Sequence, residues 1–138
     1  MPTLHFDPHP QADDIAILSK GLMAYAHEQR GLPPIQCFAF YFRDEQNTIL
    51  GGLNGACLYG CLYIDQLWMS EHFRKTGYGT QLMKKAHEHG KDQGCTFAAV
   101  NTMDWEALGF YQKLGYELEF TRKGFMKDAK FYFLRKNL

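Results

Sequence analysis

Hydrophobic residues recur at helical spacing in the first third of the chain. The members of this pattern lie three or four residues apart: Ile15, Leu18, Leu22 and Tyr25. Asp13 and Asp14 precede it, and acidic residues favour the first turn of a helix because the N-terminus carries a partial positive charge. We therefore predict an amphipathic helix that ends near Gly31, just before two prolines. Residues 4–6 are compatible with a short strand.

Three β-like runs follow the predicted helix. They cover residues 35–43, 48–59 and 61–70. The residues DEQN at 44–47 and the glycine Gly60 separate the runs, and both are typical of turns. Short turns between consecutive strands predict an antiparallel meander.

The second half of the chain alternates between strand and helix patterns. Helices are predicted at residues 79–94 and 105–115, and strands at residues 95–102, 116–120 and 130–136. Residues 95–102 are almost wholly apolar, which is typical of a strand buried on both faces. This order of elements predicts one mixed α/β domain over residues 1–138.

The composition narrows the function classes. The 138 residues are enough to bury about two thirds of the surface of the unfolded chain. Fifteen Lys and Arg balance fifteen Asp and Glu, so no net field attracts nucleic acid or an acidic membrane. No apolar run reaches the roughly 18 residues of a membrane span, and the N-terminus lacks the apolar stretch of a signal peptide. We expect a cytoplasmic protein that binds neither nucleic acid nor membranes.

Neither the cysteines nor the histidines indicate a metal site. The four cysteines lie in apolar or strand-like surroundings and form no CxxC pair: Cys37, Cys57, Cys61 and Cys95. We therefore expect buried thiols in a reducing compartment. His87 and His89 lie two residues apart on a predicted helix and point in different directions, and only His72 lies beside a candidate ligand site. We expect no bound metal.

The stretch FRKTGYGTQLM, residues 73–83, places two glycines and two cations at a predicted helix start. The first turn of a helix leaves backbone N–H groups unpaired, and glycines let a bulky anion approach them. Arg74 and Lys75 add formal charge, so a phosphate or pyrophosphate is the expected ligand. The stretch does not fit a Walker A loop, and Leu82 stands where a Rossmann turn needs its third glycine.

The pattern R-x-x-G-x-G between a strand and a helix resembles the pyrophosphate loop of the GNAT family of acetyl-coenzyme A dependent N-acetyltransferases. The segment YIDQLWMSEHFRKTGYGTQLM at 63–83 resembles the family's motif A from its fourth strand into the following helix. The segment ALGFYQKLGYE at 107–117 resembles motif B. The resemblance is clear over about residues 48–120 and thinner at both ends.

The resemblance implies a GNAT fold, with a mixed and mostly antiparallel sheet of six or seven strands flanked by about four helices. The family's fourth and fifth strands splay apart and coenzyme A inserts between them; here these strands are residues 61–69 and 95–101. The backbone of Leu67, Trp68 and Met69 would then pair with the pantetheine amides. The pyrophosphate would lie among Arg74, Lys75, Thr76, Gly77, Tyr78, Gly79 and Thr80.

Two residues are the candidates for proton transfer. Tyr111 aligns with the tyrosine that many family members place beside the coenzyme sulfur, and a phenol can protonate a departing thiolate; the alternative is that Tyr111 only packs against the cofactor. Asp65 is the candidate base. Alternation along the strand would place its side chain on the same face as Tyr63 and Leu67. A structural carboxylate is the alternative for Asp65.

Two positions depart from the family pattern. Asn101 ends the apolar strand beside the expected cleft, where relatives often carry an acidic residue. It would meet the pantetheine or the acceptor, or else cap the following turn. Lys75 replaces a common glycine of the loop and adds charge.

The sequence therefore indicates an acetyl-CoA dependent N-acetyltransferase that transfers the acetyl group directly within a ternary complex. The alternatives are a non-catalytic acyl-CoA binding or sensing module and an interaction domain that uses its aromatic strands. The sequence does not decide among small amines, antibiotics, amino acids and peptide N-termini as the acceptor, nor between a monomer and a homodimer. The acceptor site is expected in residues 12–36 and 44–60, where the candidates include Tyr25, Glu28 and Tyr59; Tyr41 is a further candidate.

Overall fold

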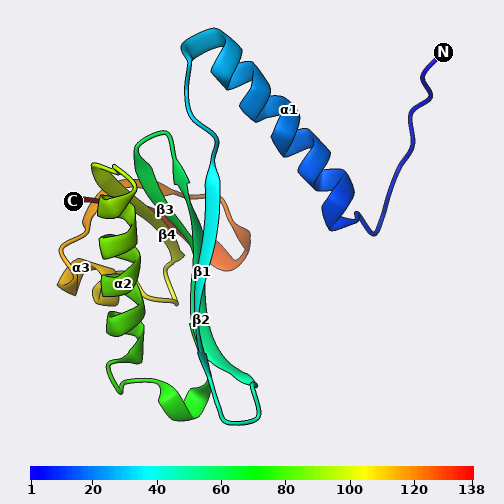
Figure 1. Cartoon of the computed structure of the whole chain (residues 1–138). Helices are drawn as coiled ribbons and strands as arrows, with labels where there is room; N and C mark the ends of the chain where they lie inside the picture. Colours follow the sequence, from blue (N-terminus) through cyan, green and yellow to red (C-terminus); the bar gives the residue numbers. More distant parts are fainter. The chain divides into compact units, whose positions relative to one another are not determined.

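The computed structural model describes all 138 residues. The chain divides into two units, residues 1–34 and residues 35–138, and each is described by itself. Figure 1 shows the helix of the first unit and the sheet with its helices in the second.

The first unit contains a single helix, α1 (Ala12–Arg30). Asp13 and Asp14 lie in its first turn, as the sequence predicts. Gly31 ends the helix in the left-handed conformation, with a φ of 65°, and its N–H donates to the carbonyl of His27 at 2.7 Å. The strand expected at residues 4–6 is wrong, because these residues pair with no strand.

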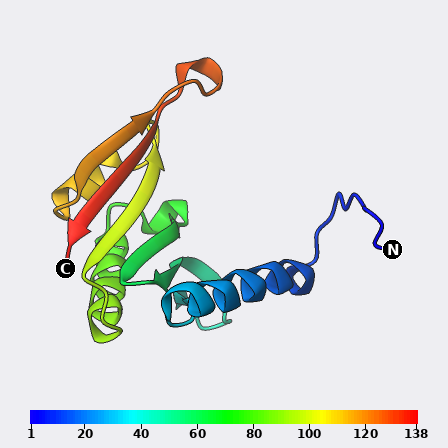
Figure 2. The same ribbon diagram turned by 90° about the horizontal axis from the view of Figure 1, so that it is seen from above.

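The second unit is built on one six-stranded sheet. Its strands are β1 (Gln36–Arg43), β2 (Ile49–Leu58), β3 (Cys61–Met69), β4 (Phe97–Met103), β5 (Glu117–Arg122) and β6 (Phe131–Asn137). Their order across the sheet is β1-β2-β3-β4-β6-β5, as Figures 1 and 2 let the reader follow. The pair β3–β4 is parallel and the other four pairs are antiparallel. The predicted meander and the mixed sheet are confirmed.

Two α-helices and two short 3-10 helices complete the second unit: α2 (Tyr78–Asp92), α3 (Leu108–Lys113), η1 (Glu71–Phe73) and η2 (Met126–Asp128). The buried residues of α2 are Leu82, Met83, Ala86 and Gly90. The first three join one core with strand residues such as Leu53, Leu62 and Ile64. Leu62 and Met83 are fully buried. None of the helices combines the length and the apolar composition needed to cross a bilayer.

The structure corrects three expectations. It has three α-helices rather than four, because the short segment 31–35 with its two prolines joins α1 directly to β1. β4 is not buried on both faces, since alternate residues such as Phe97 are only partly covered. The Phe97 ring lies beneath the Arg135 guanidinium, at 4.0 Å from the ring centroid. Cys37 is exposed on β1, whereas the other three cysteines are buried thiols.

Candidate active site

The two central strands separate after a short stretch of pairing. Residues Cys61–Ile64 of β3 lie opposite Phe97–Val100 of β4. Beyond these four pairs β3 continues to Met69 paired with β2 alone, and β4 continues to Met103 paired with β6 alone. The splay inferred from the sequence is therefore confirmed. The strands that correspond to the family's fourth and fifth are numbered β3 and β4 here, because no strand precedes α1.

A bulge in β3 lies at the point where the strands separate. Asn54 of β2 pairs with Gln66, but the next residue, Gly55, pairs with Ile64, so Asp65 has no partner on β2. An extra residue in one strand breaks the alternation of side chains. The expectation that Asp65 shares a face with both Tyr63 and Leu67 is consequently wrong.

The bulge sends the flanking side chains to opposite faces of the sheet. Leu67 pairs with the buried Leu53 and packs on the core that contains α2. Tyr63 pairs with Ala56 and projects to the other side, here called the open face, which also carries Asn54 and Trp68. Asp65 is exposed. A carboxylate at the bulge therefore stays hydrated without a buried partner.

The separation of the strands opens a cleft of about 640 Å³. It brings together seven of the residues singled out in the sequence: Asp65, Leu67, Trp68, Met69, Arg74, Asn101 and Tyr111. Five further residues line it that were not among the site candidates: Gln66, Thr102, Trp105, Glu106 and Ala107. The last three lie in the β4–α3 connection, where only Ala107 belongs to the segment that resembles motif B.

The glycine-rich junction lies between η1 and α2. Gly77 is the residue before α2 and has a φ of 87°, and Lys75 is also in the left-handed region with a φ of 60°. A glycine at position 75 would adopt this conformation without strain, so the lysine is the costlier residue there. Thr76 donates a hydrogen bond from its hydroxyl to the carbonyl of Phe73. Tyr78 packs its ring 4.8 Å from that of Phe42, which fixes the start of the helix.

Arg74 connects this junction to the cleft. Its Nε donates to the carbonyl of Met69 at 3.0 Å. This bond uses one of the backbone groups that the sequence left free for pantetheine. The remaining guanidinium N–H groups of Arg74 stay available to an anion.

Tyr111 projects from α3 into the cleft and is 6% exposed. Burial, and next the negative charge of Glu106, raise the pKa of Tyr111 to about 12. Its N–H donates to Ala107 and its carbonyl accepts from the N–H of Tyr116, each at 3.1 Å. The phenol is therefore neutral at pH 7, and the backbone that carries it is fixed by hydrogen bonds at both ends of the short helix.

A second buried tyrosine, Tyr116, packs against the ring of Tyr111. The ring of Tyr116 is 3% exposed and lies 5.7 Å from that of Tyr111 in an edge contact. The Tyr116 hydroxyl and the Nε2 of His87 are 2.7 Å apart. Burial, followed by the charges of Lys136 and Lys91, lowers the pKa of His87 to about 4. The imidazole is thus neutral at pH 7.

Protonation of His87 should weaken the fold in mild acid. The folded protein binds this proton only near pH 4, whereas the unfolded chain binds it near pH 6.5. The free energy of unfolding therefore falls as the pH drops from about 6.5 towards 4. Urea titrations at pH 7.5 and pH 5 should show a smaller loss for His87→Gln than for the wild type. The exposed control His72→Gln should keep the full loss, and an equal loss in His87→Gln would contradict the assignment.

Asn101 and Tyr63 meet where the strands separate. The Asn101 Nδ2 donates to the Tyr63 hydroxyl at 3.3 Å. Burial first, then the charge of Asp65, raise the pKa of Tyr63, and the Asn101 hydrogen bond opposes them. Asn101 is thus held by a tyrosine of the neighbouring strand. The sequence did not indicate this contact, because strict alternation along β3 assigns Tyr63 to the same face as Leu67.

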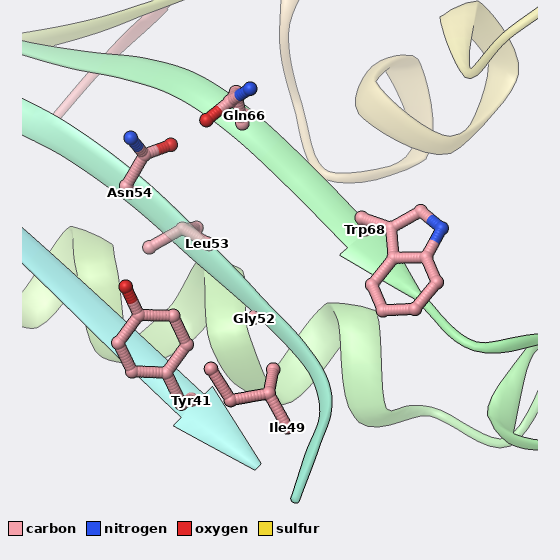
Figure 3. A pocket seen from close by; sticks show the side chains of 7 residues that line it. All are labelled: Tyr41, Ile49, Gly52, Leu53, Asn54, Gln66 and Trp68. Carbon is pink, nitrogen blue, oxygen red and sulfur yellow. The ribbon is translucent and has the colours of Figure 1, made fainter.

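A second groove, of about 230 Å³, lies on the open face beside the cleft (Figure 3). Tyr41, Asn54, Gln66 and Trp68 are among its lining residues, and the last two also line the cleft. Tyr41 thus lies in a groove that adjoins the cleft. Tyr59 lies in the β2–β3 turn at the opposite end of the strands. The two remaining acceptor candidates, Tyr25 and Glu28, belong to the first unit.

Two diverging central strands beside a glycine-rich helix start are the arrangement that the resemblance to acetyl-CoA dependent transferases implies. The model of the acetyltransferase (GNAT) family matches residues 5–116, and the chain belongs to this family.

Individual relatives support the same family. The blasticidin-S acetyltransferase of Streptomyces morookaense is 35% identical over 86 residues, which are 62% of this chain and 63% of that protein. The chain thus spans slightly under two thirds of this relative. A solved Agrobacterium tumefaciens protein, provisionally assigned as an acetyltransferase, is 25% identical, with a TM-score of 0.86 and full coverage of both chains. A GNAT family acetyltransferase from Elizabethkingia anophelis, solved with acetyl-CoA bound, shares the fold at 19% identity, with a TM-score of 0.65 over 97% of this chain and 95% of that one.

Proposed function

We propose that the protein is an acetyl-CoA dependent N-acetyltransferase that transfers the acetyl group directly to an amine. The observation that carries the proposal is the early end of β3–β4 pairing, which leaves two strands diverging next to Arg74 and the start of α2. The family membership and the acetyl-CoA in the E. anophelis structure support it.

The residues at the cleft suit each part of coenzyme A. The β3 backbone at Leu67 faces the cleft where β4 no longer pairs with it, so an amide of an extended pantetheine finds partners there. The backbone of Trp68 instead pairs with Gly52 of β2, because hydrogen-bonded pairs alternate along an antiparallel ladder and the N–H of Ser70 bonds to Leu50. The N–H groups of Tyr78, Gly79 and Thr80 open α2 and suit the pyrophosphate. Lys75, Thr76 and Gly77 complete that loop, and Arg74 adds a charged donor beside it.

Two groups suit the proton steps. An alkyl amine is almost wholly protonated at pH 7, and freeing its lone pair costs roughly 4 to 5 kcal/mol. We assign Asp65, hydrated at the bulge, as the base. Tyr111 suits the departing sulfur, but its pKa of about 12 lies above the value of about 8.5 for a thiol. Full proton transfer would be uphill by about 5 kcal/mol, so Tyr111 stabilises the thiolate by donating a hydrogen bond.

Direct transfer is favoured because no cysteine in the core is a suitable acyl carrier. Burial raises the pKa of Cys57 to about 11, and the neighbouring Cys95 adds to the shift. Burial also raises the pKa of Cys61. A nucleophilic thiol needs the opposite shift. The acceptor is an amine of a small molecule or peptide, and the S. morookaense relative makes blasticidin S one candidate.

Cofactor binding should depend on Arg74. Replacing it with methionine keeps the apolar stem and removes the charged donors, so the Kd for coenzyme A should rise about tenfold or more. Calorimetric titration measures this change, with Arg122→Met on the distant β5 as the matched control. An unchanged Kd in Arg74→Met would contradict its assignment.

The activity itself is tested by thiol release from acetyl-CoA with a panel of amines. Amine-dependent release supports the transferase. Tight coenzyme A binding without release from any amine, and without hydrolysis, would favour a non-catalytic binding module instead.

A further inference from the structure

The groove on the open face begins with an aromatic row across three strands. Tyr41 of β1 lies opposite Gly52 of β2, and Gly52 lies opposite Trp68 of β3. Both rings are about half exposed, at 52% for Tyr41 and 55% for Trp68. Figure 3 shows them on either side of Gly52. Exposed aromatic faces at this spacing offer stacking surface to a flat group.

Gly52 is required for the shape of this row. A Cβ at this position would lie 2.6 Å from the backbone oxygen of Phe40 and 2.7 Å from the Cδ1 of Tyr41. The Tyr41 ring therefore rests directly on the strand, and the floor between the two rings carries no side chain. A thin, flat group fits such a floor better than a puckered one.

The next row of the groove is made of amides. Asn54 of β2 lies opposite Gln66 of β3, and Figure 3 shows the two side chains next to each other. The Oδ1 of Asn54 is buried and has no hydrogen-bond partner. A buried acceptor without a donor is costly, so this oxygen is suited to a ligand N–H. Gln66 is exposed and can both donate and accept.

Charge distinguishes the two ends of the groove. The Arg43 guanidinium lies 5.2 Å from the centroid of the Tyr41 ring, so a positive charge between the rings would be repelled. The other end opens past Gln66 to Asp65, where a positive amine is favoured. The groove therefore suits an uncharged head at one end and an amine at the other.

We propose that this groove binds the acceptor through a flat, conjugated and uncharged head group that carries N–H donors on its edge. The head lies between Tyr41 and Trp68 and donates to Asn54, while the amine of the same molecule extends past Gln66 into the cleft. The inference rests on the proposed transferase function and adds the chemical class of its substrate.

Three probe amines separate the features of this head. The first is para-(aminomethyl)benzamide, which is flat and carries amide donors. The second is its cyclohexane counterpart, which keeps the carboxamide but is puckered. The third is methyl para-(aminomethyl)benzoate, which is flat but has no donor. We expect kcat/KM for thiol release to be about tenfold higher with the first probe than with either of the others.

Two variants assign the preference to residues. Tyr41→Ala should lower kcat/KM for the benzamide about tenfold and change it less than twofold for the cyclohexane probe. Asn54→Leu, of similar volume, should remove the preference for the amide over the ester. If Asn54→Leu does not fold, Gln66→Met tests the same amide row from an exposed position. Phe120→Ala, at 55% exposure on β5, is the control that should leave all three values unchanged.

The outcomes separate this inference from the function on which it rests. Equal kcat/KM for the three probes, or an equal loss for all three in Tyr41→Ala, would overturn the head-group assignment while leaving the transferase intact. If no amine supports thiol release, the transferase fails, and calorimetric binding of the benzamide decides on the groove. Binding that weakens about tenfold in Tyr41→Ala supports the groove, and an unchanged or undetectable affinity overturns it.

Discussion

Replacing Tyr111 with phenylalanine should lower kcat about 100-fold and leave the Kd for acetyl-CoA nearly unchanged. The hydroxyl is the only group lost, and Tyr111 lines the cleft. A positioned hydrogen-bond donor to the developing negative charge contributes roughly 100-fold or more to the rate. Thiol release under saturating substrate measures kcat, and calorimetry measures Kd.

The pH profile of the wild type provides a second check on Tyr111. Its pKa of about 12 means that the phenol does not ionise below pH 10, so it should produce no alkaline limb in that range. The matched control is Tyr59→Phe in the distant β2–β3 turn, which should keep full activity. A kcat within twofold of the wild type in Tyr111→Phe would leave packing as the sole role of this residue.

Replacing Gly55 with alanine should destabilise the second unit by about 3 kcal/mol. A Cβ at this position would lie 2.1 Å from the carbonyl oxygen of Tyr63. That oxygen belongs to the backbone of β3, so it cannot move away without shifting the bulge at Asp65. Urea denaturation followed by fluorescence measures the loss.

The control for this prediction is Gly109→Ala in the same unit. Gly109 lies in α3 with nothing within 4 Å of the added Cβ and a helical backbone, so the change should be neutral or slightly stabilising. If Gly55→Ala proves as stable as Gly109→Ala, the strands pack less tightly at the bulge than the structure indicates.

The sequence was sufficient for the order of elements and for the position of the glycine-rich junction before α2. Periodicity located α1, the meander and α2 to within a few residues, because each is a local pattern repeated over several positions. The glycines and cations of the junction are also consecutive in the chain. These features need no knowledge of which strands pair.

The bulge at Asp65 could not be predicted, because it depends on the register between two strands. β3 on its own reads as regular alternation, and only its pairing with Gly55 shows that one residue is extra. The contact between Tyr116 and His87, 29 positions apart, likewise requires the tertiary fold. Both features bear on the surroundings of the catalytic candidates, which local patterns in the sequence therefore do not determine.

The early end of β3–β4 pairing also bears on how the protein avoids unwanted association. A sheet usually exposes unpaired backbone at its borders, where another chain can add as an extra strand and begin aggregation. Here a further set of unpaired groups lies in the middle of the sheet, in the cleft that Arg74 and Tyr111 also line. A strand of another protein would bring side chains that project to both faces of the sheet, and one of these faces is the core against α2. A chain without side branches meets no such obstacle, so access to this backbone is restricted by shape before any hydrogen bond forms.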